Sequence, residues 1–462
     1  MFRRVLVLNR GEIACRIART VRRLGSEAVM VYSDADRDAL HTRAGDEAYR
    51  LGAGPVRESY MNLEAVEAAV RTSAADAVHP GYGLLSENAE LARTVTRAGA
   101  VFIGPEPDTL ELLGDKIRAR ALARAAGVEP PPGTANPVEP DAARLAQEAK
   151  QLGYPLIVKA AAGGGGIGMA IVRTEEELLK SAKTCSDRAL QAFADGRIYL
   201  ERYLERPRHI EVQILADAHG NVRALGEREC SVQRRHQKVV EETPSPAAIL
   251  SGAAGEAQRE QLCQAAERIA HAANYRGAGT VEFILDAHGT AFFLEVNARL
   301  QVEHPVTELV TGLDLVEQQL RIAGGEALSD AVRRRAEGHA IELRVYAEDP
   351  ARGFLPQPGR VVRFAWPEGA PGLRVDSGVA AGNEISTFYD PLLAKVAAHG
   401  PDRETARQRL LQALSACEVE IQGPKGPRTT NLALLRAILA HPEFVSGEYD
   451  TGLMGRMGSL PS

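Results

Sequence analysis

The amino-acid sequence predicts a multidomain protein of mixed class, with an α/β part at the N-terminus and α+β parts after it. Over roughly the first 100 residues, short apolar segments alternate with amphipathic helical ones, which is typical of a parallel sheet covered by helices. A proline-rich stretch at 128–140 interrupts this pattern and indicates a boundary. Beyond it, strand-like segments follow one another with few helices between them, which favours antiparallel sheets.

The N-terminal part begins with an apolar strand at 5–9, which leads into an amphipathic helix at 12–25. Further segments of both kinds continue the pattern, with strands expected at 27–33, 76–81 and 101–104 and helices at 62–72 and 86–98. Because successive strands are separated by helices, we expect a single parallel sheet in this part.

Two antiparallel sheets are expected in the middle of the chain. Segments at 154–160, 169–174 and 197–204 predict a small lobe, and segments at 209–217, 221–230, 280–286 and 290–300 predict a larger, mostly antiparallel sheet. A helix is expected at 312–324. From Ala340 onward the sequence is rich in short strands, and it ends in predicted helices at 402–416 and 430–440.

Composition limits the possible functions. A length of 462 residues allows roughly two to four domains, and the apolar share of 45% and charged share of 25% are ordinary for a globular protein. The net charge of −6 gives no reason to expect a nucleic acid or a membrane as partner, and no apolar run approaches the roughly 18 residues that span a bilayer. Five scattered cysteines without C-x-x-C spacing indicate a reduced, cytoplasmic protein without structural zinc.

Residues 159–169, KAAAGGGGIGM, contain the spacing G-x-G-x-x-G of dinucleotide-binding loops. In a Rossmann site that loop opens a helix, whose N-terminus holds the pyrophosphate. Here a strand-like M-A-I-V follows, and helix-prone residues begin only at 175, so a nicotinamide site is disfavoured. The lysine and hydroxyl residue of a P-loop are also missing after the last glycine. A glycine-rich hairpin that closes over phosphates, with Lys159 at its base, fits better than a linker.

The segment FFLEVNARLQVEHP (292–305) alternates polar and apolar residues. If it is extended, its period of two places five polar side chains on one face: Glu295, Asn297, Arg299, Gln301 and Glu303. Glu282, in the preceding predicted strand, would supply a second carboxylate across a hairpin. Carboxylates beside an amide oxygen suit a hard cation such as Mg²⁺. A solvated sheet face is the alternative interpretation, because such faces alternate in the same way.

The stretch CSVQRRHQKVVEETP (230–244) is basic at its centre. A nucleic-acid surface is disfavoured because aromatic residues are missing and acids follow at once; a solvated surface stays open. Gln233, His236 and Lys238 would instead suit an anionic substrate and a nucleotide. We expect Cys230 to be a packed thiol, since no base is expected beside it.

Taken together, these segments resemble the biotin carboxylase family of ATP-grasp enzymes. The resemblance is carried, in order, by the glycine loop and by NRGEIACRIART (9–20), HPGYGLLSENAELA (79–92), GDK (114–116), YPLIVKA (154–160), HIEVQILAD (209–217), CSVQRRHQKVVEE (230–242), EVNARLQVEHPVTE (295–308) and GHAIELRVYAEDP (338–350). It implies an ATP-grasp fold whose parts are a Rossmann-like pre-ATP-grasp domain at 1–112, an ATP-grasp domain at 113–330 with a mobile lid at about 131–204, and a biotin carboxylase C-terminal domain at 335–445.

The resemblance also implies a reaction, in which ATP, bicarbonate and biotin give carboxybiotin, ADP and phosphate through carboxyphosphate. Two Mg²⁺ or Mn²⁺ ions would accompany ATP, and biotin would be attached to a carrier protein or domain. A carboxyltransferase subunit would use the product, and a homodimer is the expected assembly. The segments at 32–48 and 376–386 look more like propionyl- or methylcrotonyl-type α chains than the simplest acetyl-CoA subunit. Because no A-M-K-M biotinylation motif is present, we expect either a stand-alone subunit or an N-terminal part of a longer acyl-CoA carboxylase.

Residue roles follow from the resemblance, position by position. ATP would be contacted by Lys116, Lys159, Gly163, Gly164, Gly165, Gly166, Glu201, Leu204, His209, Gln233 and His236. The metal ions would be held by Glu282, Glu295 and Asn297. Bicarbonate would be held by Lys238, Arg299, Gln301 and Val302, with Glu303 as the base that deprotonates it. Arg344 would stabilise the biotin enolate, and Tyr82 and Asp390 would lie on the biotin side.

The sequence departs from the family pattern at three places. Ile167 stands where many relatives have arginine or lysine, GPKGPR (423–428) looks like a loop insertion, and Leu84 replaces the commoner phenylalanine. Two other classes are alternatives: another ATP-grasp ligase, such as half of a carbamoyl-phosphate synthetase, or a nucleotide-binding scaffold without turnover. The first is not expected to keep RRHQK and LQVEHPVTE together with Arg344, and the second would tolerate losses among the ligand residues, which are all present.

Overall fold

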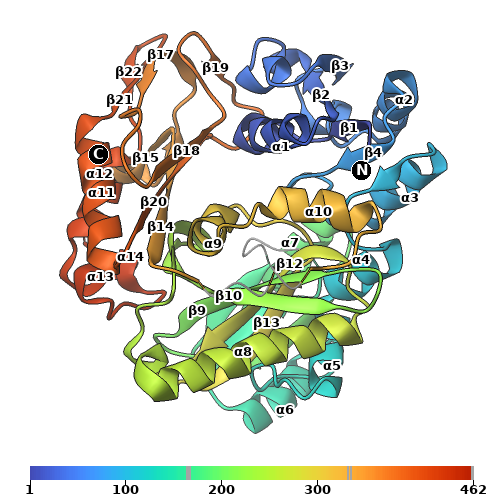
Figure 1. Cartoon of the computed structure of the whole chain (residues 1–462). Coiled ribbons are helices and arrows are strands. Elements are labelled where there is room, and N and C mark those ends of the chain that lie inside the picture. Colours follow the sequence, from blue (N-terminus) through green and yellow to red (C-terminus); the bar gives the residue numbers. More distant parts are fainter. Residues whose placement is uncertain (163–167, 330–331, 333–335, 459–462) are drawn as a thin grey trace.

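The computed structural model describes residues 1–162, 168–329, 332 and 336–458. The predicted phosphate-binding glycines, Gly163, Gly164, Gly165 and Gly166, and the departure at Ile167 therefore lie outside the described residues. Figure 1 shows an N-terminal part in blue, a middle part in green and yellow, and a C-terminal part in orange and red, arranged around a common centre. Within the described ranges, no helix is both long enough and apolar enough to cross a membrane.

The N-terminal part is a parallel five-stranded sheet in the order β3-β2-β1-β4-β5, as predicted. The strands are β1 (Arg4–Val7), β2 (Glu27–Ser33), β3 (Glu47–Gly52), β4 (Ala77–His79) and β5 (Val101–Phe102), and the helices are α1 (Gly11–Arg23), α2 (Leu63–Ser73), α3 (Ala89–Arg97) and α4 (Pro107–Gly114). Alternate residues of β1 pack on opposite faces: Val5 joins Ile13 of α1, whereas Leu6 joins Val66 of α2 and Leu91 of α3. Helices thus cover both faces, which is the Rossmann-like arrangement.

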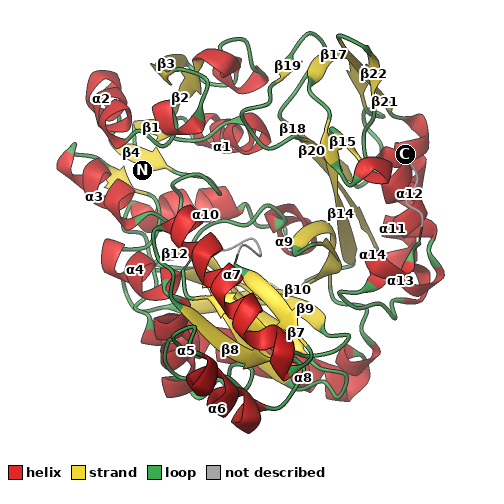
Figure 2. Ribbon diagram, turned by 180° about the vertical axis from the view of Figure 1, so that it is seen from behind, coloured by secondary structure: helices red, strands yellow, loops and turns green. Residues whose placement is uncertain are grey.

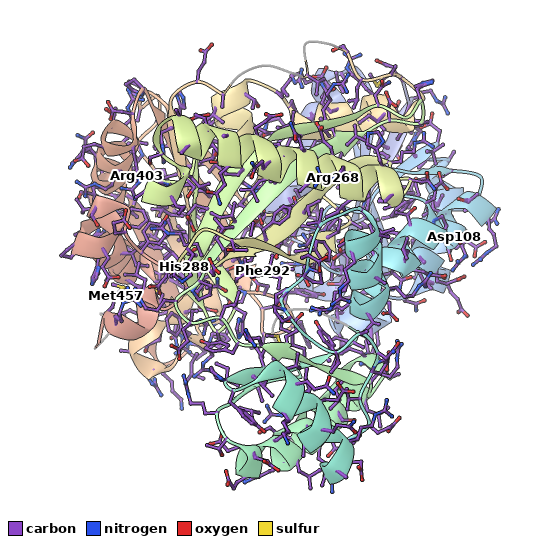
Figure 3. The ribbon with its side chains drawn as sticks, turned by 90° about the horizontal axis from the view of Figure 1, so that it is seen from below. Asp108, Arg268, His288, Phe292, Arg403 and Met457 are labelled. Carbon is purple, nitrogen blue, oxygen red and sulfur yellow. The ribbon has the colours of Figure 1, made fainter. Side chains whose placement is uncertain are left out.

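A small lobe follows the proline-rich boundary. Its antiparallel sheet, in the order β7-β6-β8, consists of β6 (Leu156–Ala160), β7 (Met169–Val172) and β8 (Ile198–Arg202), with helices α6 (Ala142–Leu152) and α7 (Glu175–Phe193). Lys159 pairs with Met169 across β6 and β7, so a strand and not a helix follows residues 163–167, and α7 begins only at Glu175. This confirms the expectation against a Rossmann loop. Figure 3 shows this lobe, in teal and green, projecting from the rest of the molecule.

The central sheet has eight antiparallel strands in the order β13-β12-β9-β10-β11-β14-β20-β18. They are β9 (Arg208–Ala216), β10 (Val222–Arg234), β11 (Gln237–Thr243), β12 (Gly277–Leu285), β13 (Ala291–Asn297), β14 (His339–Tyr346), β18 (Leu373–Ser377) and β20 (Leu392–Gly400). The pairing of Val240 on β11 with Leu343 on β14 makes the sheet continuous from the middle part into the C-terminal part. The sequence did not predict β11 as a strand, and it did not predict this pairing.

Four helices accompany the central sheet: α5 (Lys116–Ala125), α8 (Gly252–Ala272), α9 (His304–Thr311) and α10 (Leu315–Ala323). Figure 2 shows the sheet from behind, with α7 of the lobe crossing in front of it. The single helix expected at 312–324 was too long at its start, and α9 was not expected. Pro305 in the first turn of α9 and Gly312 (φ +70°) after its last residue are the start and stop signals that explain the break.

The extended segment expected at 290–300 was also too long. β13 ends at Asn297, so the alternation predicted to place Arg299, Gln301 and Glu303 on one strand face does not exist as strand structure. Residues 298–303 form an irregular connection, because α9 must begin at His304 and the chain has to turn before it. These side chains nevertheless lie close together, because Arg299 donates hydrogen bonds to Asn297 and Gln301.

The C-terminal part adds a four-stranded sheet in the order β19-β17-β21-β22 and a two-stranded one, β15-β16. These strands are β15 (Glu348–Asp349), β16 (Leu355–Pro356), β17 (Gly359–Ala365), β19 (Glu384–Ile385), β21 (Glu418–Gly423) and β22 (Gly426–Arg428), and the helices are α11 (Arg403–Ala416), α12 (Leu432–Ala440), α13 (Pro442–Ser446) and α14 (Leu453–Arg456). The segment 423–428 is thus a tight β-hairpin, with Gly423 opposite Gly426, and the interpretation as a loop was wrong.

Glu242 of β11 ties the central sheet to the C-terminal helices. Its buried carboxylate accepts hydrogen bonds from Arg403 Nε (2.6 Å), Tyr449 Oη (2.5 Å) and His339 Nε2 (2.6 Å). Arg403, labelled in Figure 3, begins α11. Although burial opposes the shift, Arg403 and His339 lower the pKa of Glu242 to about 2.

We expect Glu242→Gln to destabilise the protein by about 3–5 kcal/mol at neutral pH, because Arg403 then keeps a buried charge without its partner. The unfolded chain titrates near the ordinary value of 4.5, so this stabilisation is present above that value and shrinks as pH falls from 4.5 toward about 2. Urea unfolding of both proteins near neutral pH and at about pH 3.5 measures the difference. Glu418→Gln, in an exposed pair with Arg363, is the matched control and should change stability little. A deficit for Glu242→Gln that stays constant with pH would contradict the assignment.

Candidate active site

One cavity of about 1160 Å³ lies between the small lobe and the central sheet. Of the residues predicted from the sequence, these line it: Lys116, Lys159, Glu201, Leu204, His209, Gln233, His236, Lys238, Glu282, Glu295, Asn297, Arg299, Gln301, Val302 and Arg344. Residues from most of the stretches singled out in the sequence therefore meet at one place, although none from 9–20 is among them. Glu303 lies just behind the lining and is fully buried.

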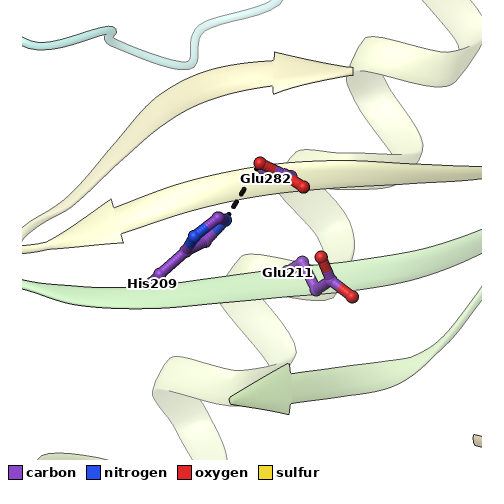
Figure 4. Close-up of side chains that lie close together, drawn as sticks. All are labelled: His209, Glu211 and Glu282. Atoms are coloured by element: carbon purple, nitrogen blue, oxygen red, sulfur yellow. Dashed lines mark hydrogen bonds and ion pairs between the residues drawn. The ribbon is translucent and has the colours of Figure 1, made fainter. Parts of the chain in front are cut away.

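The hairpin of β12 and β13 supplies two facing carboxylates. Glu282 and Glu295 are paired across the hairpin, as the sequence suggested. Lys116 Nζ lies 3.1 Å from Glu295, and His209 Nε2 lies 2.9 Å from Glu282 (Figure 4). Although burial opposes it, the Glu282 carboxylate raises the pKa of His209. The imidazole therefore takes up a proton more readily beside Glu282 than an isolated histidine does.

Lys238 is the centre of the charge network. Its Nζ donates to Glu211 (2.5 Å), Glu282 (2.9 Å) and Glu303 (2.6 Å), so a single ammonium is shared by three buried carboxylates. Despite burial, these acids hold the pKa of Lys238 well above its ordinary value. The lysine is consequently charged throughout the neutral range.

Glu211 was missed in the sequence. It lies on β9 two residues after His209, and Figure 4 shows both on the same strand beside Glu282. Alternation within HIEVQIL places residues 209, 211 and 213 on one face, and that signal was available. Ligand atoms of His209, Glu211 and Glu282 lie within 4.8 Å of one another, but Lys238 already donates to both carboxylates.

Arg299 gathers the polar residues that strand alternation was expected to align. Its guanidinium donates to Asn297 Oδ1 (3.0 Å) and Gln301 Oε1 (2.9 Å). On the other side its Nε donates to Glu87 (2.9 Å), which also accepts from the amide of Ala298 (2.9 Å). The fork-shaped guanidinium thus fixes an irregular loop through several directed bonds. Glu87, from the N-terminal part, is a second residue that the sequence did not indicate.

Glu303 and Arg344 form the buried end of the cavity. Arg344 Nη2 donates to Glu303 (3.0 Å), and the guanidinium also contacts Glu241 closely. Despite burial, Lys238 and Arg344 hold the pKa of Glu303 well below its ordinary value. Glu303 is thus an ionised carboxylate. Cys230 Sγ lies 3.9 Å from Glu303, so the expectation that no base lies beside this buried thiol was wrong.

Glu201 connects the small lobe to the floor of the cavity. Lys159 of β6 and Arg120 of α5 both contact its carboxylate closely, and Arg120 Nη2 also donates to the carbonyl of Pro131 (3.1 Å). Burial and the neighbouring cations Lys116 and Arg120 lower the pKa of Lys159 to about 7. One carboxylate shared with Arg120 does not offset that concentration of positive charge.

Tyr82 and Asp390 lie outside the lining among the described residues. The Tyr82 hydroxyl donates to Glu12 of α1, and Asp390 accepts a hydrogen bond from the amide of Leu392 (2.9 Å). Burial raises the pKa of Asp390, and Arg344 opposes this shift. Both residues approach the Arg344 end through the N-terminal and C-terminal parts.

Comparison with known proteins first defines the class. Residues 115–331 match the family described as the ATP-binding domain of the carbamoyl-phosphate synthase L chain, which corresponds to the part that holds most of the cavity. The flanking residues 1–110 and 342–456 match the biotin carboxylase N-terminal and C-terminal domains. The fold is therefore an ATP-grasp fold between two biotin carboxylase domains. The flanking matches separate the chain from a carbamoyl-phosphate synthetase.

Whole-chain relatives then define the family. Biotin carboxylase of Halalkalibacterium halodurans is 48% identical over 98% of this chain and 97% of its own length. The propionyl-CoA carboxylase alpha chain of Ruegeria pomeroyi is 45% identical over 98% of this chain and 68% of its own length. The biotin carboxylase domain dimer of 2-oxoglutarate carboxylase from Hydrogenobacter thermophilus, solved with MgADP, ADP and bicarbonate, has a TM-score of 0.93 at 41% identity and covers 99% of this chain and 98% of its own. The chain belongs to the biotin carboxylase family and is a ligase.

Replacing Arg120 by methionine should loosen the attachment of the small lobe, because Glu201 loses its link to α5 and Pro131 loses a donor. Breaking such a buried pair costs about 3–5 kcal/mol locally. Hydrogen exchange followed by mass spectrometry should show faster exchange in β8 and no change in β12. Arg124→Met, one turn along α5 and only weakly paired with Glu129 (3.8 Å), is the matched control. Unchanged exchange in β8 would show that Arg120 does not anchor the lobe.

Proposed function

We propose that this chain uses ATP and bicarbonate to carboxylate biotin held on a carrier protein or domain, through carboxyphosphate. One observation carries the proposal: a single cavity joins the facing carboxylates of Glu282 and Glu295 to the network of Lys238, Glu303 and Arg344. The first group suits a metal–nucleotide complex and the second suits a small anion beside a buried base. A related Hydrogenobacter domain solved with MgADP and bicarbonate supports the same pairing of ligands.

The nucleotide would occupy the end of the cavity beside the small lobe. Lys116 and Lys159 would meet its phosphates, Glu201 and Leu204 its base, and His209, Gln233 and His236 its ribose and base. Closure of the lobe would then exclude water from a hydrolysable intermediate.

Two Mg²⁺ or Mn²⁺ ions would be held by Glu282, Glu295 and Asn297. The donor set fits, since it offers carboxylate and amide oxygens at one edge of the cavity, and both metals take such ligands. Bound ions would neutralise the charge that develops on the phosphates.

Bicarbonate would lie between Lys238, Arg299 and Gln301, with the main chain of Val302 beside it. Glu303 would take its proton. Because Lys238 and Arg344 hold Glu303 ionised, the carboxylate is available as an acceptor but is a weak base at rest. We infer that the proton moves as bicarbonate attacks the γ-phosphate, when the bicarbonate becomes a stronger acid.

Arg344 would stabilise the enolate of the biotin ureido group, since a positioned guanidinium offsets negative charge that develops on oxygen. Tyr82 and Asp390 would complete the biotin side. We propose further that carboxybiotin passes to a carboxyltransferase acting on an acyl-CoA of the propionyl or methylcrotonyl type, and that the chain works as a homodimer. The Ruegeria relative supports the acceptor, and the Hydrogenobacter dimer supports the assembly. Assays of the copurified carboxyltransferase with each acyl-CoA and with pyruvate, and sedimentation of the pure chain, test these two points.

ATP hydrolysis should require bicarbonate and should be stimulated by free biotin. Glu303→Gln should lower turnover by about 10²–10⁴-fold, the range expected for loss of a general base, while ATP still binds. Phosphate release and calorimetric binding are the two measurements. Hydrolysis without a bicarbonate requirement or biotin stimulation would contradict the proposed function. Full turnover in Glu303→Gln would contradict the role of Glu303 as the base, but not the proposed reaction.

Nucleotide affinity should fall as pH rises, because phosphates favour the charged form of Lys159, whose pKa in the free protein is lowered to about 7. The sign follows from linkage: binding raises that pKa, so a proton is taken up, and affinity weakens by up to roughly tenfold per unit above about pH 7. Calorimetry of MgATP binding in buffers of different ionisation enthalpy measures the uptake. Lys159→Met should bind more weakly and take up fewer protons. Equal uptake by both proteins would remove Lys159 as the source.

A further inference from the structure

Lys395 is a buried lysine at the junction of three parts of the chain. It lies on β20 directly opposite Arg344 of β14, so both side chains leave the same rung of the sheet (strands in Figure 1). Its side chain is 1% exposed. Its Nζ donates to the main-chain carbonyl of Val302 (2.8 Å) and lies 3.3 Å from the carboxylate of Glu12. One ammonium thus joins the C-terminal part, the middle part and the N-terminal part.

Val302 belongs to the segment of the site that has neither helix nor strand structure. Val302 lies between Gln301 and Glu303, in the irregular connection 298–303 between β13 and α9. Main-chain hydrogen bonds to this connection are long, from the amide of His304 to the carbonyl of Gln301 (3.4 Å) and from that of Val306 to the carbonyl of Glu303 (3.3 Å), and among the described residues no main-chain amide donates to Val302. Side-chain donors are therefore needed to fix its carbonyls. Lys395 supplies one such bond, and the ring of His304 supplies another to the carbonyl of Gln301 (2.8 Å).

A buried ammonium keeps its place only when its partners are fixed, because an unpaired charge in the interior is costly. Glu12 is 3% exposed and accepts a hydrogen bond from the hydroxyl of Tyr82, which follows β4, the strand that pairs with β1. Lys395 also lies 5.9 Å from the centre of the Tyr82 ring, a cation–π distance. Glu12 and Tyr82 of the N-terminal domain therefore fix the position of Lys395. Lys395 in turn fixes the position of the Val302 carbonyl, next to Glu303 in the chain.

We propose that Lys395 is the positioning residue of the loop that carries Gln301 and Glu303. It acts through the carbonyl of Val302 and touches neither bicarbonate nor nucleotide. The inference rests on the proposed function, because it places a bicarbonate-holding loop under the control of Lys395. If the loop loosens, the use of bicarbonate should become less efficient. The affinity for nucleotide should stay the same, because other strands and the small lobe form that end of the cavity.

The experiment compares three variants of the whole chain. Lys395→Met removes the bond to Val302 and the pair with Glu12, and Glu12→Gln removes only the charge that anchors Lys395. Asn383→Ala is the matched control, because Asn383 also donates from the C-terminal part to a main-chain carbonyl of another part, that of Asp38 (2.9 Å), away from the loop. Measured for each are kcat, KM for bicarbonate, Kd for MgATP and hydrogen exchange at 299–304.

Lys395→Met should raise KM for bicarbonate and lower kcat by about tenfold or more each, because misplacing a reacting group by about 1 Å costs up to 10²-fold. Its Kd for MgATP should stay within about twofold, a split that a general loss of folding would not give. Exchange at 299–304 should become faster. Glu12→Gln should show the same split more weakly, and Asn383→Ala should match the wild type.

Unchanged bicarbonate kinetics and unchanged exchange in a folded Lys395→Met would overturn the proposal, as would equal losses in bicarbonate and nucleotide binding. If Lys395→Met does not fold, Glu12→Gln decides: the weaker split supports the proposal, and wild-type kinetics with wild-type exchange overturn it. The exchange measurement needs no turnover. A wild-type chain without bicarbonate-dependent hydrolysis would therefore refute the proposed function and leave the positioning of the loop still measurable.

Discussion

The site depends on one shared charge. Lys238 donates to Glu211, Glu282 and Glu303, and each of these carboxylates is buried. A buried carboxylate without a cation or donor is costly, and each of these acids has a second partner: Arg228 for Glu211, His209 for Glu282 and Arg344 for Glu303. Lys238 is the partner that all three share. The strands that carry them, and the loop before α9, are thereby fixed relative to one another. The nucleotide end and the bicarbonate end of the cavity are built as one unit.

The continuous central sheet adds Arg344 to this network. Because β11 pairs with β14, Arg344 of the C-terminal part is held within hydrogen-bonding distance of Glu303 of the middle part. The N-terminal part contributes from the other side, through Glu87 to Arg299 and through Glu12 to Lys395. All three parts therefore bear on the short connection 298–303. We infer that relative movement of the parts changes the geometry at Glu303 more than the geometry at the β12–β13 hairpin.

Local patterns in the sequence predicted many of the strands and helices. They did not predict which strands distant in sequence pair with one another. Repeated βα segments predicted the parallel N-terminal sheet, and strand-like residues after the glycines predicted the hairpin around Lys159. Alternation was extended too far beyond Asn297, because periodicity does not report where a chain must turn to start a helix such as α9. Most of the residues assigned from the resemblance line one cavity. Glu87 was missed because its partner Arg299 is distant in sequence, which a single sequence does not reveal, whereas the alternation of HIEVQIL could have indicated Glu211.

Lys238 and Arg344 keep Glu303 ionised before any substrate arrives. Infrared difference spectra of the wild type against Glu303→Gln, recorded at about pH 5 and about pH 8, test it directly, because ionised and protonated carboxyl groups absorb at separate frequencies and the pKa of Glu303 is held well below its ordinary value. We predict that the wild-type minus Glu303→Gln difference contains a carboxylate band and no protonated carboxyl band at both pH values. A protonated carboxyl band that grows toward the lower pH and is lost in Glu303→Gln would contradict the account.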